Sequence, residues 1–154
     1  MLSEEIEEKE KKISRGKLNR ASGARFELKV RKDLEAHNWI TDKWTKNIDL
    51  EKGQLVPAKR KFNPFNRIMS IGTGFPDFIG FKPIIGEKKD DYQVYKVIGV
   101  EAKSKGTLDK LEKEKCSFLL KNNVFKNILI AKKGNKKGEI IYTDFETKKE
   151  FDIF

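Results

Sequence analysis

The sequence predicts an α/β domain in which helices flank a central mixed β-sheet. Two segments, residues 22–38 and 107–122, repeat apolar side chains at helical spacing. Other segments, of which residues 92–102 are the clearest, carry the apolar runs typical of strands. The two kinds of segment alternate along a chain of 154 residues, which is long enough for one domain and short for two.

By composition the chain divides into a charged arm and one domain. Residues 1–20 are almost entirely charged or polar and predict an exposed helix or arm, with only four side chains to bury: Leu2, Ile6, Ile13 and Leu18. Residues 21–154 predict the domain. It begins with a helix over residues 22–38, whose buried face is formed by three residues at i, i+4 and i+8: Phe26, Val30 and Leu34.

Strands fill much of the remaining chain. Residues 39–40 and 44–50 predict one strand or two, and further strands are expected within 68–81 and in 92–102, 126–131 and 139–145. The basic, turn-rich residues 53–64 predict a loop, and the charged residues 87–91 predict a hairpin turn. A second helix is expected from a cap at Thr107 to about Asn122, which gives the element order α-β-β-β-α-β-β.

Charge and rare residues exclude several classes of protein. The formal net charge is +10, so the surface favours polyanions, and nucleic acid is the first partner to consider. The one cysteine, Cys116, excludes an intrachain disulfide and a thiolate-rich zinc site, and indicates a structural thiol. The one histidine, His37, excludes a Ser-His-Asp triad and is expected to end the first helix. With no signal peptide or long apolar run, the sequence predicts a soluble cytoplasmic protein without a membrane partner.

Three charged residues on two neighbouring predicted strands form the candidate catalytic group. Side chains alternate along residues 92–102, so Glu101 and Lys103 share the face opposite the apolar residues. Asp77 follows Pro76 at the entrance of a neighbouring strand, where its carboxylate is expected to meet Glu101. The structural alternatives are a solvated strand face for Glu101 and Lys103, and an ordinary Pro-Asp turn.

The order Pro76-Asp77 followed by Glu101-Ala102-Lys103 resembles the PD-(D/E)xK nuclease superfamily. The block Gly23-Ala24-Arg25-Phe26-Glu27 is similar to the opening of the archaeal Holliday-junction resolvases, and residues 74–78, 100–103 and 106–108 are similar to the VRR-NUC group. The resemblance implies a restriction-endonuclease-like core. It also implies a Mg²⁺-dependent DNA endonuclease that leaves 5′-phosphate and 3′-hydroxyl ends, and the similarity to Holliday junction resolvases implies selectivity for branched DNA.

The resemblance gives each residue of the group a role. Asp77 and Glu101 would bind Mg²⁺, for which Mn²⁺ can substitute, because two carboxylates supply the hard oxygen ligands that this ion prefers. Lys103 would orient the attacking water, help to deprotonate it, or stabilise charge on the phosphorus.

Two helix residues are expected to assist. Glu27 would be a direct or water-mediated metal ligand, and its structural alternative is an ion pair with Arg31. Relatives commonly place a phosphate-contacting residue in the second helix, where Lys115 or Glu112 stands here. The alternative for Lys115 is that its long side chain only reaches out from the edge of the core.

Further basic residues predict the DNA-binding surface. Residues 107–138 hold nine lysines against three acidic residues. The candidate DNA contacts are Lys59, Arg60, Lys61, Arg67, Lys105, Lys110, Lys132 and Lys133. Four aromatic residues near basic ones are candidates for base stacking, with core packing as the alternative for most: Phe62, Phe65, Phe75 and Phe81.

DNA, branched or single-stranded, is the expected partner, and two symmetric strands would suit a homodimer. No nucleotide cofactor is expected, because the glycine-rich residues 72–74 precede a strand and not a helix. Two other functions stay open: a DNA-binding or scaffold subunit without turnover, and a basic RNA-binding protein in which the motif is coincidental. The basic surface also has a structural alternative, because a solvated, lysine-rich surface accompanies heat tolerance.

Overall fold

The computed structural model describes residues 2–72 and 74–154, so Met1 and Thr73, the centre of the glycine-rich residues 72–74, lie outside it. Its elements are α1 (Leu2–Ala36), β1 (Ile40–Lys43), β2 (Lys46–Asp49), β3 (Gln54–Pro57), β4 (Arg60–Asn63), β5 (Ile68–Ile71), β6 (Phe78–Lys89), β7 (Tyr92–Ala102), α2 (Lys110–Lys121), β8 (Asn127–Lys133) and β9 (Ile140–Asp144).

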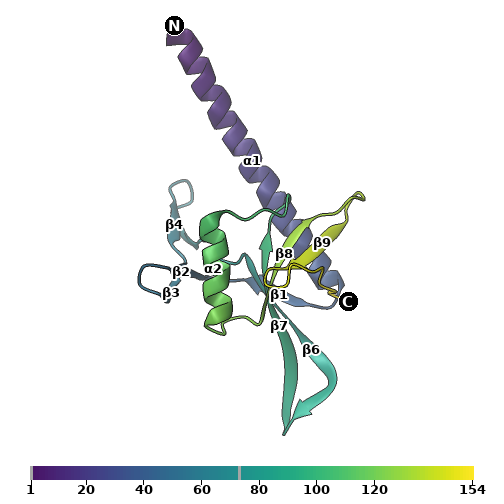
Figure 1. Ribbon diagram of the computed structural model, residues 1–154. Coiled ribbons are helices and arrows are strands. Elements are labelled where there is room, and N and C mark those ends of the chain that lie inside the picture. The colour runs from purple at the N-terminus through teal and green to yellow at the C-terminus, as the bar shows by residue number, and fades with distance from the viewer. Residues whose placement is uncertain (1, 73) are drawn as a thin grey trace.

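The centre of the molecule is a five-stranded sheet in the order β1-β6-β7-β8-β9. Its two faces are covered by α1 and α2, as Figure 1 shows. Strands β7 and β8 are parallel and are joined through α2, whereas the other neighbouring strands are antiparallel. The prediction of an α/β domain with a mixed sheet is therefore confirmed.

The first helix runs without a break through the charged arm, so the boundary expected between residues 20 and 21 does not interrupt it. Ion pairs four residues apart, Glu7–Lys11 at 3.7 Å and Glu8–Lys12 at 2.8 Å, join successive turns of its exposed part. Only its last third packs on the sheet, through the three predicted residues Phe26, Val30 and Leu34. The helix ends one residue before His37, as predicted.

Each face of the sheet has its own apolar core, because side chains alternate along the strands. Ile98 and Val100 of β7 pack beneath α1. Ile128 and Ile130 of β8 pack on the other face, beneath α2, together with the fully buried Cys116. Burial raises the pKa of the Cys116 thiol to about 12, as expected for a structural cysteine.

The second helix begins two residues later than predicted, with Asp109 and not Thr107 as its N-cap. The Asp109 carboxylate accepts the N–H of Glu112 at 2.8 Å, and the Glu112 carboxylate accepts the N–H of Asp109 at 2.9 Å. This reciprocal pair is a capping box. Thr107 cannot build one, because Lys110 stands three residues after it and its ammonium group accepts no hydrogen bond.

The prediction of a loop over residues 53–64 is wrong, because β3 pairs with β2 and β4 pairs with β5. Every side chain of β4 is exposed, so no apolar alternation marks that strand in the sequence. The predicted turn at residues 87–91 is also too wide. Strand β6 continues to Lys89, and only Asp90 and Asp91 form the turn.

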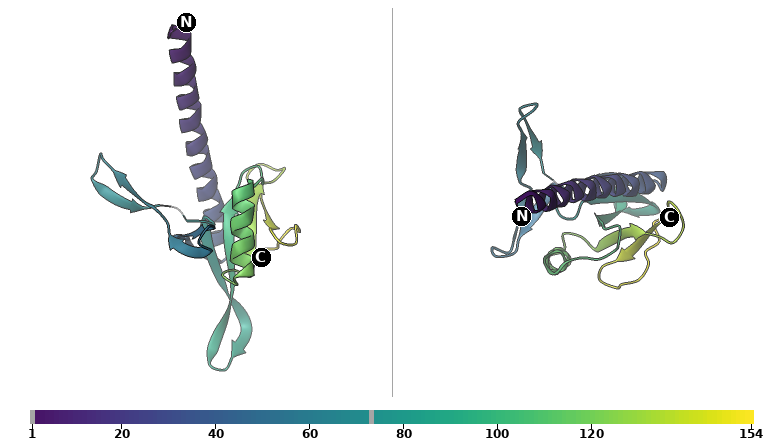
Figure 2. Two further views of the ribbon diagram at one scale, coloured as in Figure 1. Left: turned by 60° about the vertical axis from the view of Figure 1, so that its left-hand side comes forward. Right: turned by 90° about the horizontal axis from the view of Figure 1, so that it is seen from above.

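Three segments project from the body formed by the sheet and α2. They are the first part of α1, the β4–β5 hairpin and the distal ends of β6 and β7, and Figure 2 shows that they point in different directions. Among the described residues, no helix combines the length and the apolar character needed to cross a membrane.

Gly99 allows the chain to pack closely at the point where it approaches the predicted site. A Cβ atom at this position would lie 2.9 Å from Pro76 Cγ and 3.3 Å from the Phe125 ring. Pro76 itself is fully buried. The missing side chain of Gly99 therefore lets Pro76, and with it the neighbouring Asp77, lie against β7.

We expect Gly99→Ala to lower the free energy of unfolding by about 1–3 kcal/mol, because the added methyl group overpacks this contact. The matched control is Gly23→Ala in α1, where a Cβ atom meets nothing within 4 Å. That control is expected to stabilise the helix by about 0.5–1 kcal/mol. Urea unfolding followed by circular dichroism measures both values, and an unchanged midpoint for Gly99→Ala would contradict the packing argument.

Candidate active site

Asp77 and Glu101 meet at the end of the ladder between β6 and β7. Phe78 pairs with Val100, so the next residues outward, Asp77 and Glu101, lie opposite each other. The Asp77 N–H donates to Glu101 Oε2 at 3.1 Å, and the Ala102 N–H donates to Asp77 Oδ2 at 2.9 Å. The structure thus brings together the two carboxylates that the sequence predicted to meet.

Backbone hydrogen bonds hold the residues before Asp77. The Gly74 N–H donates to the Trp44 carbonyl at 3.0 Å, and the Phe75 N–H donates to the Lys46 carbonyl at 2.8 Å. A Cβ atom at Gly74 would overlap both of those carbonyl oxygens, so only glycine permits this approach. The Trp44 N–H in turn donates to the Asp77 carbonyl at 3.1 Å, which fixes the backbone of the acidic residue itself.

The two carboxyl groups are buried side by side, which disfavours two negative charges. Asp77 is 9% exposed and Glu101 is 5% exposed. Burial raises the pKa of Asp77 to about 6, although the hydrogen bond from Ala102 opposes the shift. Burial, followed by the charge of Asp77, raises the pKa of Glu101 to about 8. Near neutral pH the pair therefore retains a proton, which a bound cation would displace.

The ammonium group of Lys103 lies between two carboxylates. Its Nζ is 3.5 Å from Glu101 Oε1 and makes a second, shorter ion pair with Glu112. Partial burial lowers the pKa of Lys103, but the hydrogen bond with Glu112 and the charge of Glu101 outweigh it and leave the pKa above its usual value. Lys103 therefore remains protonated, which suits positioning and charge stabilisation and does not suit removal of a proton from water.

Glu112 connects the start of α2 to the acid pair. One of its carboxylate oxygens accepts the Asp109 N–H of the capping box, and the other binds Lys103. The sequence pattern predicted Glu112 only as a phosphate contact and did not predict its ion pair with Lys103. The signal that could have revealed this position is the Asp-x-x-Glu spacing, which fixes a carboxylate at the third residue of a helix.

The negative charge of Glu27 adds to the effect of burial and raises the pKa of Asp77 further. Its side chain is half-buried on α1. The proposed structural alternative, an ion pair with Arg31, does not form, since Arg31 pairs with Glu35 at 3.0 Å.

Lys115 contacts β2 and the segment that precedes Asp77. Its Nζ donates to Asn47 Oδ1 of β2 at 3.0 Å and lies 5.6 Å from the centroid of the Phe75 ring. Among the contacts of the described residues, Lys115 reaches neither Asp77 nor Glu101. The residue of α2 that the structure brings to the acid pair is Glu112.

The donor set fits a hard divalent cation bound by two carboxylates. Nowhere in residues 2–72 and 74–154 do three or more His, Cys, Asp or Glu side chains gather as a metal-binding group, so Glu27 does not complete a three-residue set. Asp77 and Glu101 alone suffice for Mg²⁺, which commonly binds through one or two carboxylates and fills its other positions with water and substrate phosphate.

The predicted DNA contacts fall on two surfaces. One is the β4–β5 hairpin and its approach, where four basic residues are exposed: Lys59, Arg60, Lys61 and Arg67. The other is formed by the segment before α2, the first residue of α2 and the end of β8, and carries Lys105, Lys110 and the partly buried Lys132. Lys133 is the exception, because side chains alternate along β8 and its Nζ lies 5.9 Å from the centroid of the Phe26 ring, on the α1 face of the sheet.

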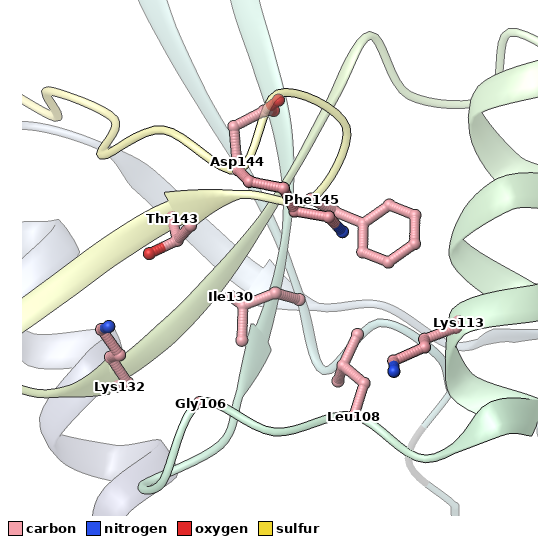
Figure 3. A pocket seen from close by; sticks show the side chains of 9 residues that line it. Gly106, Leu108, Lys113, Ile130, Lys132, Thr143, Asp144 and Phe145 are labelled. Atoms are coloured by element: carbon pink, nitrogen blue, oxygen red, sulfur yellow. The ribbon is translucent and has the colours of Figure 1, made fainter.

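A cavity of about 160 Å³ lies between β8, β9 and the start of α2, and Figure 3 shows the side chains that line it. Ile130, which lines it, pairs with Glu101 between β8 and β7. Leu108 and Phe145 complete its apolar lining, and three lysines border it: Lys113, Lys132 and Lys148. The cavity is therefore a partly apolar depression bordered by basic side chains.

The raised pKa values predict that the protein loses stability as the pH rises in the absence of metal. The pKa values of Asp77 and Glu101 are higher in the folded protein than in the unfolded chain. The free energy of unfolding is therefore highest, with respect to these two groups, below about pH 4, and it falls as the pH rises to about 8. We expect Glu101→Gln to raise the free energy of unfolding at pH 8 in EDTA by on the order of 1 kcal/mol. Thermal unfolding against pH measures both effects.

The control for this measurement is Glu114→Gln, which removes an exposed carboxylate from α2. It should keep the pH dependence of the wild type. If Glu101→Gln also keeps that dependence, or loses stability at pH 8, the buried pair is not the source of the effect.

No protein-family model, curated protein or solved structure matches the chain. The chemistry of the site therefore has to be inferred from its own residues. These are a buried acid pair, a lysine that pairs with both Glu101 and Glu112, and exposed basic residues on the β4–β5 hairpin and around the start of α2.

Proposed function

We propose that this protein is a Mg²⁺-dependent DNA endonuclease built on a restriction-endonuclease-like core. The observation that carries the proposal is the convergence of Asp77, Glu101 and Lys103, with the lysine Nζ 3.5 Å from Glu101 and the two acidic residues joined through backbone hydrogen bonds. These are the three residues on which the resemblance to the PD-(D/E)xK superfamily rests. The five-stranded mixed sheet with a helix on each face supports the same core.

Asp77 and Glu101 are the residues that would hold the cation. When bound, Mg²⁺ neutralises charge on the scissile phosphate and makes an attacking water more acidic. The raised pKa values of the two carboxyl groups favour this role, because a divalent charge relieves the repulsion that the buried pair otherwise avoids by retaining a proton. Glu27 adds negative charge nearby.

Lys103 supplies the positive charge of the site. Its ammonium group is held by Glu101 and Glu112, so it is oriented before any substrate arrives. In that state it stabilises negative charge on the phosphate oxygens and orients water for in-line attack. No covalent intermediate with the protein is required, and the products are 5′-phosphate and 3′-hydroxyl ends.

The distribution of charge supports DNA as the substrate. The formal net charge is +10, and exposed basic residues lie on the β4–β5 hairpin and around the start of α2. A structure-selective enzyme that cuts two symmetric strands would act as a homodimer, because each strand then meets an equivalent site.

Cleavage of end-labelled four-way junction, flap, duplex and single-stranded DNA tests the proposal. We expect Mg²⁺-dependent cutting that EDTA abolishes and that Asp77→Asn, Glu101→Gln and Lys103→Ala each reduce by about 100-fold or more. Glu101→Gln should retain or tighten DNA binding, because it removes a negative charge near phosphate. Glu114→Gln is the control and should cut normally. Binding of every DNA without cutting would instead identify a non-catalytic subunit.

Glu112→Gln tests the positioning of Lys103. Glutamine can still accept the Asp109 N–H, so α2 should fold normally, but it no longer holds the ammonium group by charge. We expect kcat to fall by about 10- to 100-fold with little change in KM for DNA. The alkaline limb of the pH–rate profile should move to lower pH, because the hydrogen bond with Glu112 helps to raise the pKa of Lys103. An unchanged kcat and profile would exclude this role.

A further inference from the structure

The β4–β5 hairpin, residues 60–71, is an arm that stands apart from the sheet. Its two strands pair with each other and belong to no larger sheet. The Gly72 N–H donates to the Lys59 carbonyl at 3.0 Å and closes the base of the arm. Figure 2 shows the arm projecting from the body, away from α2 and the central strands.

The tip of the arm presents an aromatic side chain to solvent. Phe65 is 97% exposed, the most exposed of the large apolar residues described. The turn that carries it is ordered by side-chain hydrogen bonds: Asn63 Oδ1 accepts the Phe65 N–H at 3.0 Å, and Asn66 Oδ1 accepts the Ile68 N–H at 3.2 Å. Three further exposed apolar side chains lie along the same hairpin: Phe62, Ile68 and Met69. Phe62 and Met69 are paired across the ladder and so share one face of the arm, and neighbouring exposed apolar side chains of this kind indicate a binding surface.

The charge of the arm identifies the kind of ligand. No acidic residue occurs between Glu51 and Asp77, whereas Lys59, Arg60, Lys61 and Arg67 all lie on or beside the arm and are exposed. A ligand that matches both features offers flat apolar faces and closely spaced negative charges. Unpaired nucleic-acid bases, which stack on aromatic side chains while phosphates bind basic ones, meet this description.

The arm is also connected directly to the acid pair. After β5, the chain passes through Gly74 and Phe75, which are bonded to the Trp44 and Lys46 carbonyls, and reaches Asp77. A strand held on the arm is therefore held by the segment that carries a catalytic carboxylate. This continuity favours nucleic acid over a membrane surface as the ligand.

We propose that Phe65 stacks on an unpaired base of DNA while Arg60, Lys61 and Arg67 bind the flanking phosphates. The arm thereby selects DNA in which duplex adjoins unpaired bases. The proposal depends on the proposed function for the choice of DNA as substrate, but it concerns binding and does not require cleavage.

Fluorescence anisotropy in EDTA, where no cutting occurs, tests this inference. The probes are a labelled duplex and the same duplex interrupted by a run of unpaired thymines. We expect Phe65→Ala to weaken binding of the interrupted duplex by about 10-fold or more and to change binding of the intact duplex less than about twofold. Phe65→Trp should preserve binding, and 2-aminopurine placed in the unpaired run should be quenched by the wild type and by Phe65→Trp only.

Ile85→Ala is the matched control, because Ile85 is 96% exposed on the other projecting hairpin. It should leave both affinities unchanged. The proposal is overturned if Phe65→Ala weakens both DNAs equally or neither, or if it weakens binding to phosphatidylserine vesicles and not to DNA. If the wild type cleaves DNA but Phe65→Ala has no effect, only this inference fails. If Phe65→Ala has the expected effect but no DNA is cut, only the proposed activity fails.

Discussion

The mutual burial of Asp77 and Glu101 is the constraint on which the rest of the structure depends. Two carboxylates taken out of water next to each other oppose folding unless donors and positive charge surround them. The backbone supplies the donors, since each acidic side chain accepts an N–H from the strand that carries the other: Asp77 N–H for Glu101, and Ala102 N–H for Asp77. Lys103 supplies the charge. The close approach that this exchange requires is made possible by the absence of side chains at Gly74 and Gly99.

The mixed sheet explains how so few residues can build the site. The antiparallel pair β6–β7 brings the acidic residues opposite each other, and the parallel pair β7–β8 requires a crossover, which α2 provides. The first turn of α2 therefore lies close to the end of β7, and its Glu112 side chain binds Lys103. One capping box therefore serves two purposes, because it begins the helix and fixes the Glu112 carboxylate beside Lys103.

Sequence patterns predicted those elements whose apolar side chains are buried at regular helix or strand spacing. Strand β7 has its expected bounds, and the meeting of Asp77 with Glu101 follows from hairpin register, which is local. Strands β3 to β5 could not be predicted, because backbone pairing holds them and burial contributes little. The choice between Lys115 and Glu112 could not be made either. It depends on the rotation of α2 about its axis, which the packing of Cys116 and Leu119 on the sheet decides.

The self-contained pairing of β4 with β5 keeps the proposed DNA-binding arm structurally separate from the acid pair. The hairpin shares no ladder with the central sheet, and its base closes between Lys59 and Gly72. Insertions, deletions or replacement within it therefore leave the register of the five-stranded sheet intact. Related chains of this design could diverge in preference by exchanging one short segment, and a designer could graft a different hairpin onto the same acid pair.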